Sequence, residues 1–254
     1  MSLTNAPLSE EQVWQLAQAC ASRLAGLQIP GLLGIFAIGS LPGGYFRPGQ
    51  SDLDLVCLLG ESPAENALTE QFSEAIAAII AGMQAEFGRQ EMEVFLRRLA
   101  ELRPDETSGL TPNPDLTARL LKQSRQLWGD FSLDQLKMPT KADFAAELAR
   151  YRQYWAANAG QQPSAELSDR ALTNHALTLM RLYLAARYGQ MEYDKRRIVP
   201  LFLAEERQLV LPSAIIAGVQ QVLAGNRLGK LERQAFEAGL QQLQQIIPGG
   251  KAAA

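Results

Sequence analysis

A glycine- and proline-rich segment between two apolar runs is the feature that most restricts how this chain folds. The run LLGIFAI at 32–38 is short, apolar and bounded by glycines, which is typical of a buried strand. The segment GSLPGGYFRPGQS at 39–51 follows, and its glycines and prolines exclude a helix there. The run DLDLVCLL at 52–59 then predicts a second strand. The sequence therefore predicts two strands joined by an irregular loop.

The second strand begins with two acidic residues. Residues two apart share a face of a strand, so Asp52 and Asp54 are expected to project together while the leucines between and after them enter the core. Two adjacent carboxylates repel each other unless a positive group lies between them. Mg²⁺ takes oxygen ligands and completes its coordination with water and phosphate. The pair therefore predicts a divalent-metal site.

The start of the loop and a later strand extend this site. Gly39 lets the backbone approach a ligand closely, and Ser40 offers hydroxyl and N–H donors to phosphate oxygens. A third strand is expected in QEMEVFLRRL at 90–99, where a further carboxylate is available. Glu91 and Glu93 share a face by the same two-residue rule, so the spacing alone does not choose between them.

The rest of the chain predicts helices, and its composition changes near Met138. Ser9 is the expected N-cap of a helix that ends near Gly26, with a capping box closed by Gln12. Alanine and glutamine dominate the second half, which suits a helical bundle. A small α/β domain followed by a helical one is therefore expected. Further helices are predicted at 65–87, from 113 to 128–129, and at 141–157, 168–188, 197–208, 213–224 and 228–247.

The composition excludes several classes of protein. With one histidine, His175, the chain cannot form a multi-histidine zinc site, and a Ser-His-Asp triad would have to use that residue. Cys20 and Cys57 lie in apolar runs and are expected to be buried free thiols. The net charge of −3 argues against nucleic acid as the main partner. Apolar stretches fall short of the ~20 residues of a membrane span, and no signal peptide is visible, so we expect a cytoplasmic protein without membrane partners.

These motifs together resemble the signature of the nucleotidyltransferase superfamily: Gly-Ser, a Gly/Pro loop, and Asp-hydrophobic-Asp on a strand. The likeness is closer to the aminoglycoside adenylyltransferases of the streptomycin/spectinomycin 3''-type. Their loop also has a Gly-Gly pair and a basic-Pro pair, here at 43–44 and 47–48. Their third strand reads Glu-Val, which selects Glu93. Their second domain has the helix pattern found here at 174–181, closed by Gly189.

The resemblance implies a fold class, α+β, with particular domains. The N-terminal nucleotidyltransferase domain, a small mixed sheet with flanking helices, is expected at 1–138. An all-α helical-bundle domain is expected at 139–248, followed by a flexible tail at 249–254.

The resemblance also implies roles for individual residues. Asp52 and Asp54 would hold Mg²⁺ against the triphosphate of ATP, and Glu93 would take the proton from an acceptor hydroxyl. The implied nucleotide-binding residues are Gly39, Ser40, Arg181 and Lys195. AMP would then pass from ATP to a small acceptor, with release of pyrophosphate.

The acceptor stays open at this stage. A cationic aminoglycoside would need an acidic surface, for which Glu91, Glu101, Glu166 and Asp169 are candidates, none of them assigned. The alternative acceptors are another small hydroxyl compound and a partner protein. Two alternative functions also stay open: a nucleotide-binding protein without catalysis and a helical interaction module. We expect a monomer or weak dimer. His175 is expected to be a polar helix residue. Trp128, Trp155 and the pair Tyr151 and Tyr154 are expected to serve in packing.

Overall fold

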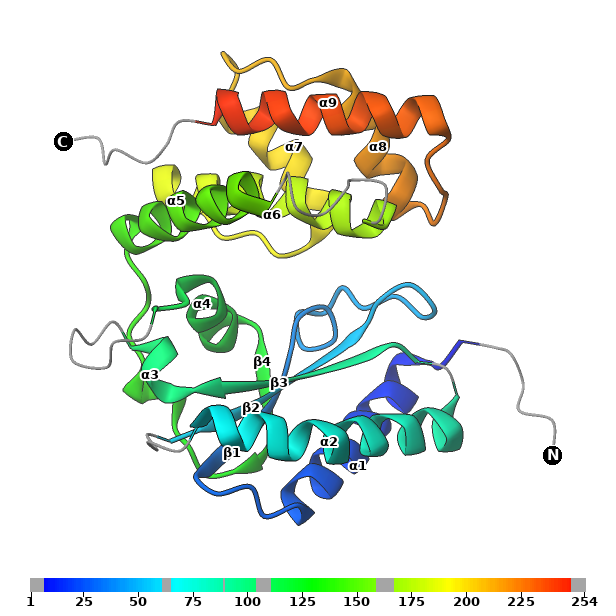
Figure 1. Ribbon diagram of the computed structural model, residues 1–254, viewed down its shortest axis with the longest axis vertical. Coiled ribbons are helices and arrows are strands. Elements are labelled where there is room, and N and C mark those ends of the chain that lie inside the picture. The colour runs from blue at the N-terminus through cyan, green and yellow to red at the C-terminus, as the bar shows by residue number, and fades with distance from the viewer. Residues whose placement is uncertain (1–6, 61–64, 89, 104–110, 159–166, 248–254) are drawn as a thin grey trace. The chain divides into compact units, whose positions relative to one another are not determined.

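A computed structural model describes residues 7–60, 65–88, 90–103, 111–158 and 167–247 (Figure 1). The chain divides into two compact units, Met1–Met138 and Pro139–Ala254. The expected tail at 249–254 lies outside the described residues.

The first unit is built on a four-stranded mixed sheet with the strand order β3-β2-β1-β4. Its strands are β1 (Leu32–Ile38), β2 (Leu53–Leu59), β3 (Met92–Arg98) and β4 (Ser124–Gly129). Strands β2 and β3 pair in parallel, whereas β1 pairs antiparallel with both β2 and β4. Strands β1, β2 and β3 confirm the three strands that the sequence predicts, and the mixed sheet with helices confirms the expected α+β class.

The strand β4 corrects the prediction of a helix that runs from 113 to 128–129. Helix α4 (Pro114–Lys122) ends early, and the chain then extends along the free edge of β1. The side chains of β4 are mostly polar and partly exposed, so they carry no apolar alternation that would predict a strand. Backbone hydrogen bonds to β1 decide the conformation instead, which is a tertiary effect.

Helices cover both faces of this sheet. Helices α1 (Glu10–Gly26) and α2 (Glu65–Phe87) pack against one face, where the buried side chains of β2 are Leu53, Leu55 and Cys57 (Figure 1). The short α3 (Leu99–Leu102) and α4 pack against the other face, onto Val56 and Leu58. The alternation of β2 residues between the two faces follows from the pleat of a strand.

The start of α1 confirms the predicted capping box. The Ser9 hydroxyl accepts a hydrogen bond from the Gln12 backbone N–H at 3.3 Å, and the Gln12 side chain accepts one from the Ser9 backbone N–H at 2.8 Å. Two N–H groups that the first helical turn leaves without helical partners are satisfied in this way.

The second unit is helical in its described part. Its helices are α5 (Lys141–Asn158), α6 (Asp169–Tyr188), α7 (Lys195–Glu205), α8 (Ser213–Leu223) and α9 (Lys230–Ile246). Helix α6 lies at the centre, because it contacts each of the other four. It ends at Gly189, whose φ of 71° is the left-handed conformation typical of a helix C-terminus. These helices confirm the predicted ones, with ends displaced by a few residues.

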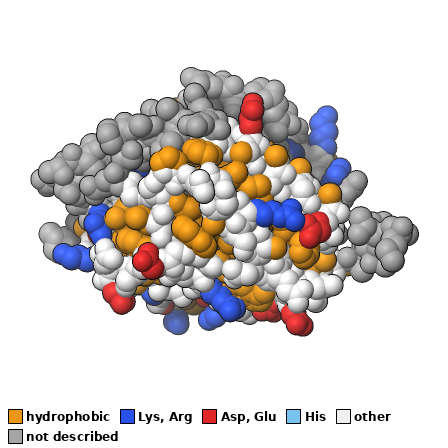
Figure 2. All heavy atoms as spheres, turned by 90° about the horizontal axis from the view of Figure 1, so that it is seen from below, with side chains coloured by type: hydrophobic (Ala, Val, Ile, Leu, Met, Phe, Trp, Pro, Cys, Tyr) orange, Lys and Arg blue, Asp and Glu red, His pale blue; other side chains and the backbone are white. Residues whose placement is uncertain are grey.

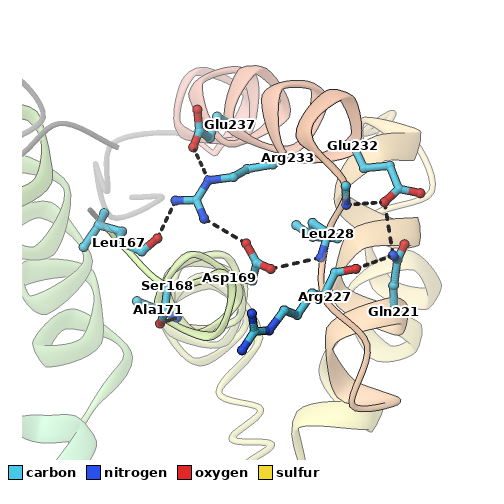
Figure 3. A network of polar contacts seen from close by, with 11 residues as sticks. Leu167, Ser168, Asp169, Ala171, Gln221, Arg227, Leu228, Glu232, Arg233 and Glu237 are labelled. Atoms are coloured by element: carbon cyan, nitrogen blue, oxygen red, sulfur yellow. Dashed lines mark hydrogen bonds and ion pairs between the residues drawn. The ribbon is translucent and has the colours of Figure 1, made fainter. Parts of the chain in front are cut away.

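A network of polar contacts fixes the N-terminus of α6 to α9 (Figure 3). The Asp169 carboxylate accepts hydrogen bonds from Arg233 Nη1 and from the Leu228 backbone N–H, each at 2.9 Å. Arg233 also donates to the Leu167 carbonyl and to Glu237. The negative charge of Asp169 near a helix N-terminus is favourable in itself. Asp169 therefore links the start of α6 to α9 and to the residues just before α9.

Figure 2 shows one face of the molecule, where apolar side chains gather in the middle and both basic and acidic side chains lie among and around them. Among the described residues, no helix is long and apolar enough to cross a membrane.

Candidate active site

Two carboxylates come together where β2 and β3 begin. Asp54 is the second residue of β2, and its partner in the parallel register is Glu93, the second residue of β3. Partners in a parallel pair point to the same face of the sheet. That face is the one covered by α3 and α4, because Val56, two residues after Asp54, is buried there. The register therefore places Asp54 and Glu93 beside each other.

The backbone of Gly39 lies directly against Asp54. On β1, Ile38 is the register partner of Asp54, and Gly39 follows it with a φ of +83°. A Cβ atom at Gly39 would lie 2.7 Å from Asp54 Oδ2, and it would also force a side chain into the left-handed region. Glycine is therefore required here for two separate reasons, the backbone conformation and the room that the carboxylate occupies.

Hydrogen bonds within the loop shape its path between β1 and β2. Gly43 N–H donates to the Gly39 carbonyl, and Tyr45 N–H donates to the Ser40 carbonyl, both at 3.1 Å. The Tyr45 hydroxyl donates to Gln123 Oε1 at 3.0 Å, which ties the loop to the end of α4. Ser40 is half-buried at the start of this loop, next to the carboxylate site.

Asp52 lies immediately before β2 and is half-buried, with its Oδ1 atom shielded from solvent. Among the described residues, no group of three His, Cys, Asp or Glu side chains is arranged to hold a metal ion. Mg²⁺ in phosphate-transfer sites commonly uses one or two carboxylates together with substrate phosphates. Asp52 and Asp54 fit that partial donor set.

The register of β2 with β3 also distinguishes Glu93 from Glu91 as the candidate base. Glu91 precedes β3, and its backbone carbonyl accepts a hydrogen bond from the Leu53 N–H at 2.9 Å. Glu93 is the residue opposite Asp54, and its side chain is exposed. An exposed carboxylate beside two aspartates that could bind a metal is in a suitable place to accept a proton from a bound substrate.

The two expected phosphate-binding cations belong to the second unit. Arg181, in α6, is only 7% exposed, and its guanidinium lies over the ring of Tyr193, 5.4 Å from the ring centroid. Arginine is rarely buried to this extent unless other groups compensate its charge. Lys195 is the first residue of α7, after Asp194, which caps that helix by accepting from the Arg196 N–H at 3.1 Å.

The acidic candidates for an acceptor site differ in their surroundings. Asp169 is engaged in the network of Figure 3, and Glu101 accepts a hydrogen bond from the Arg98 N–H at 3.0 Å. Glu91 is exposed, and Glu166 lies outside the described residues.

His175 has a different environment from the polar helix position that the sequence predicts. It is 2% exposed, and burial lowers its pKa to about 3. Its Nδ1 lies 3.0 Å from the Tyr151 hydroxyl and its Nε2 lies 2.9 Å from Gln244 Nε2. The ring stacks on Trp155 with the centroids 3.8 Å apart. The predicted packing role of the aromatic residues is confirmed for Tyr151 and Trp155, whereas Trp128 and Tyr154 are exposed.

Comparison of the fold with solved structures gives an extensive likeness to an adenyltransferase. Spectinomycin adenyltransferase AAD(9) from Enterococcus faecialis, solved with ATP and spectinomycin, matches with a TM-score of 0.62 and 18% sequence identity. The match covers 94% of this chain and 99% of that chain. The chain therefore shares the fold of this adenyltransferase, in agreement with the fold that the resemblance in the sequence implies.

Other comparisons add less. A toxin–antitoxin solved with AMP-PNP matches with a TM-score of 0.28 and 18% identity, over 60% of this chain and 94% of that chain. A mutant MntA–HpeT toxin–antitoxin matches with a TM-score of 0.27 and 17% identity, with the same coverage. Likenesses this weak carry no weight for the fold. No protein-family description and no curated protein matches the sequence.

Proposed function

We propose that this protein is a Mg²⁺-dependent nucleotidyltransferase that moves AMP from ATP to a hydroxyl group of a small acceptor and releases pyrophosphate. The observation that carries the proposal is the register of β2 with β3, which places Asp54 beside Glu93, together with Gly39 packed against the Asp54 carboxylate. The shared fold with spectinomycin adenyltransferase AAD(9) supports the same reaction class.

In this proposal Asp52 and Asp54 bind Mg²⁺, and Gly39 and Ser40 contact a phosphate group of ATP. Bound Mg²⁺ would neutralise negative charge on the triphosphate, which lowers the cost of attack on phosphorus. Gly39 has no side chain, and the Asp54 carboxylate occupies the space that a side chain there would fill. These residues belong to the proposed nucleotidyltransferase domain, residues 1–138.

Glu93 acts as the general base. Its carboxylate takes the proton of the acceptor hydroxyl, whose oxygen then forms a bond to the α-phosphorus of ATP. The bond from that phosphorus to the bridging oxygen breaks, and pyrophosphate leaves with the electron pair. General-base assistance of this kind is typically worth ~10²–10⁴-fold in rate.

Arg181 and Lys195, from the proposed helical domain at 139–248, neutralise the β- and γ-phosphates. Such cations act by charge stabilisation and positioning, which supply most of the catalysis in phosphoryl transfer. Arg181 suits the role because the Tyr193 ring restricts its guanidinium to one region.

The acceptor that we propose is a cationic aminoglycoside or a related antibiotic, which would make the protein a resistance enzyme working in the cytoplasm, where ATP is supplied. The support is the solved neighbour, whose structure contains spectinomycin together with ATP.

The decisive experiment measures pyrophosphate release from ATP and Mg²⁺ with spectinomycin or streptomycin as acceptor. Glu93→Gln is expected to lose turnover by at least ~10²-fold while ATP still binds. Glu91→Gln makes the same change two residues earlier, before β3, and is the matched control, whose kcat should stay near the wild-type value whether or not Glu91 contributes to acceptor binding. Release that survives Glu93→Gln would remove this residue from the role of base. The absence of release with both drugs would exclude them as acceptors.

A further inference from the structure

Gln90 is a buried amide that the sequence patterns do not single out. It lies between α2 and β3 and is 6% exposed. Its Nε2 donates to the backbone carbonyl of Ser51 at 2.7 Å and to that of Glu91 at 3.2 Å. Buried polar side chains normally have such partners, because an unsatisfied amide would cost free energy. The question is why an amide is needed at this place.

The two carbonyls that Gln90 contacts stand at the beginnings of the two strands that carry the candidate site. Ser51 immediately precedes Asp52, and Glu91 lies two residues before Glu93. The Glu91 carbonyl also accepts the Leu53 N–H at 2.9 Å, at the point where β2 and β3 begin to pair. One side-chain amide therefore joins the two chain segments just before their parallel pairing starts.

Gln90 is itself held in place from α2. Its backbone N–H donates to the Gly88 carbonyl at 2.8 Å, and its backbone carbonyl accepts a hydrogen bond from Gln84 Nε2 at 3.1 Å. Helix α2 packs on the face of the sheet opposite to Asp54 and Glu93. A connection thus runs from α2, through Gln90, to the start of both strands.

We propose that Gln90 is a positioning residue for the nucleotidyltransferase reaction, which fixes the separation of the Asp52–Asp54 pair from Glu93. This inference rests on the proposed function. The ends of paired strands open more readily than their middles, and all three carboxylates lie within two residues of a strand end. A metal-binding pair and a base must stay within a few tenths of an ångström of their working geometry, which requires supporting hydrogen bonds behind them.

The test compares Gln90→Leu and Gln90→Glu with the wild type. Leucine removes both donors, whereas glutamate keeps the shape of the side chain and places an acceptor against two carbonyls. Gln126→Leu is the matched control, because Gln126 is an exposed glutamine of β4 in the same sheet.

For both Gln90 variants, kcat should fall at least tenfold and the Mg²⁺ concentration for half-maximal rate should rise several-fold, with KM for the acceptor unchanged. Equal kinetics in the Gln90 variants and the wild type would overturn the proposal. A purely structural role would lower thermal stability and leave the Mg²⁺ dependence unchanged.

Two readouts do not depend on turnover. Mn²⁺ binding in the presence of AMP-PNP, followed by electron paramagnetic resonance, should weaken several-fold in the Gln90 variants and stay unchanged in Gln126→Leu. Amide hydrogen exchange at Leu53 should be slow in the wild type and accelerate at least tenfold in the Gln90 variants.

The outcomes separate the two proposals. A wild type that does not bind Mn²⁺ with AMP-PNP would contradict the proposed function, while hydrogen exchange at Leu53 would still decide the role of Gln90. If neither variant folds, wild-type exchange at Leu53 decides: an amide as unprotected as an exposed loop amide would refute the role of Gln90.

Discussion

The buried histidine makes the stability of this protein sensitive to mild acid, and His175→Gln is the change that exposes the effect. His175 is the one histidine in the chain, and burial lowers its pKa from 6.5 to about 3. The unfolded chain therefore binds a proton between these pH values that the folded protein does not. The contribution of the neutral ring to the free energy of unfolding is fully present above pH 6.5 and is lost as the pH falls toward 3.

The magnitude follows from the two pKa values. Each pH unit between them changes the free energy of unfolding by about 1.4 kcal/mol, so the loss between pH 7 and pH 5 is about 2 kcal/mol. The described groups that contact the ring from neighbouring helices are Tyr151 and Trp155 of α5 and Gln244 of α9, none of them charged in this range. No nearby carboxylate therefore offsets the cost of protonation among these contacts.

The assay is urea unfolding at pH 7, 6 and 5, followed by circular dichroism, for the wild type and His175→Gln. Carboxylates elsewhere titrate equally in both proteins, so the difference in unfolding free energy isolates the histidine. That difference should change by about 2 kcal/mol between pH 7 and pH 5, in favour of the variant at low pH. The reasoning would be refuted if the unfolding free energies of the two proteins changed equally with pH, or if the His175 ring titrated near pH 6.5 by NMR.

Three further predictions concern other parts of the molecule. Gly39→Ala should abolish activity, because a Cβ would collide with the Asp54 carboxylate. Gly44→Ala should cost only about 1–2 kcal/mol of stability, because Gly44 has a similar φ but a Cβ there would have nothing within 4 Å. Thermal unfolding and pyrophosphate release distinguish the two variants. Asp169→Asn should lower the unfolding free energy by about 1–3 kcal/mol and leave kcat unchanged, as measured by urea unfolding and turnover, because its contacts are within the bundle. The thiols of Cys20 and Cys57, whose pKa values burial raises to about 11 and about 12, should not react with a thiol reagent at pH 8 until the protein is unfolded.

Much of the sheet could be predicted because its signals are local. Strands β1 and β2 are short apolar runs next to a glycine- and proline-rich loop, and the helix N-cap at Ser9 lies within one turn of its partner. These features depend on residues that are close in the chain, so the sequence alone indicates them. Strand β4 lacks such a signal, because its polar residues form a strand only by pairing with β1.

The candidate site was predictable to the same limited extent. The spacing of Asp52 and Asp54 indicated a shared face, but spacing treats Glu91 and Glu93 alike. The parallel register of β2 with β3 is what places Glu93 opposite Asp54, and the contact of Gly39 with Asp54 depends on the pairing of β1 with β2.

What the sequence by itself determined is therefore the first three strands, most of the helices, the acidic pair and the glycine-rich loop between two strands. The tertiary structure alone decided that Gln90 joins two strand ends and that His175 is held neutral in a bundle. The identity of a glutamine or a histidine in the sequence does not show whether its side chain is buried or exposed. Its hydrogen bonds and its charge depend on burial, and burial is set by residues far away in the chain.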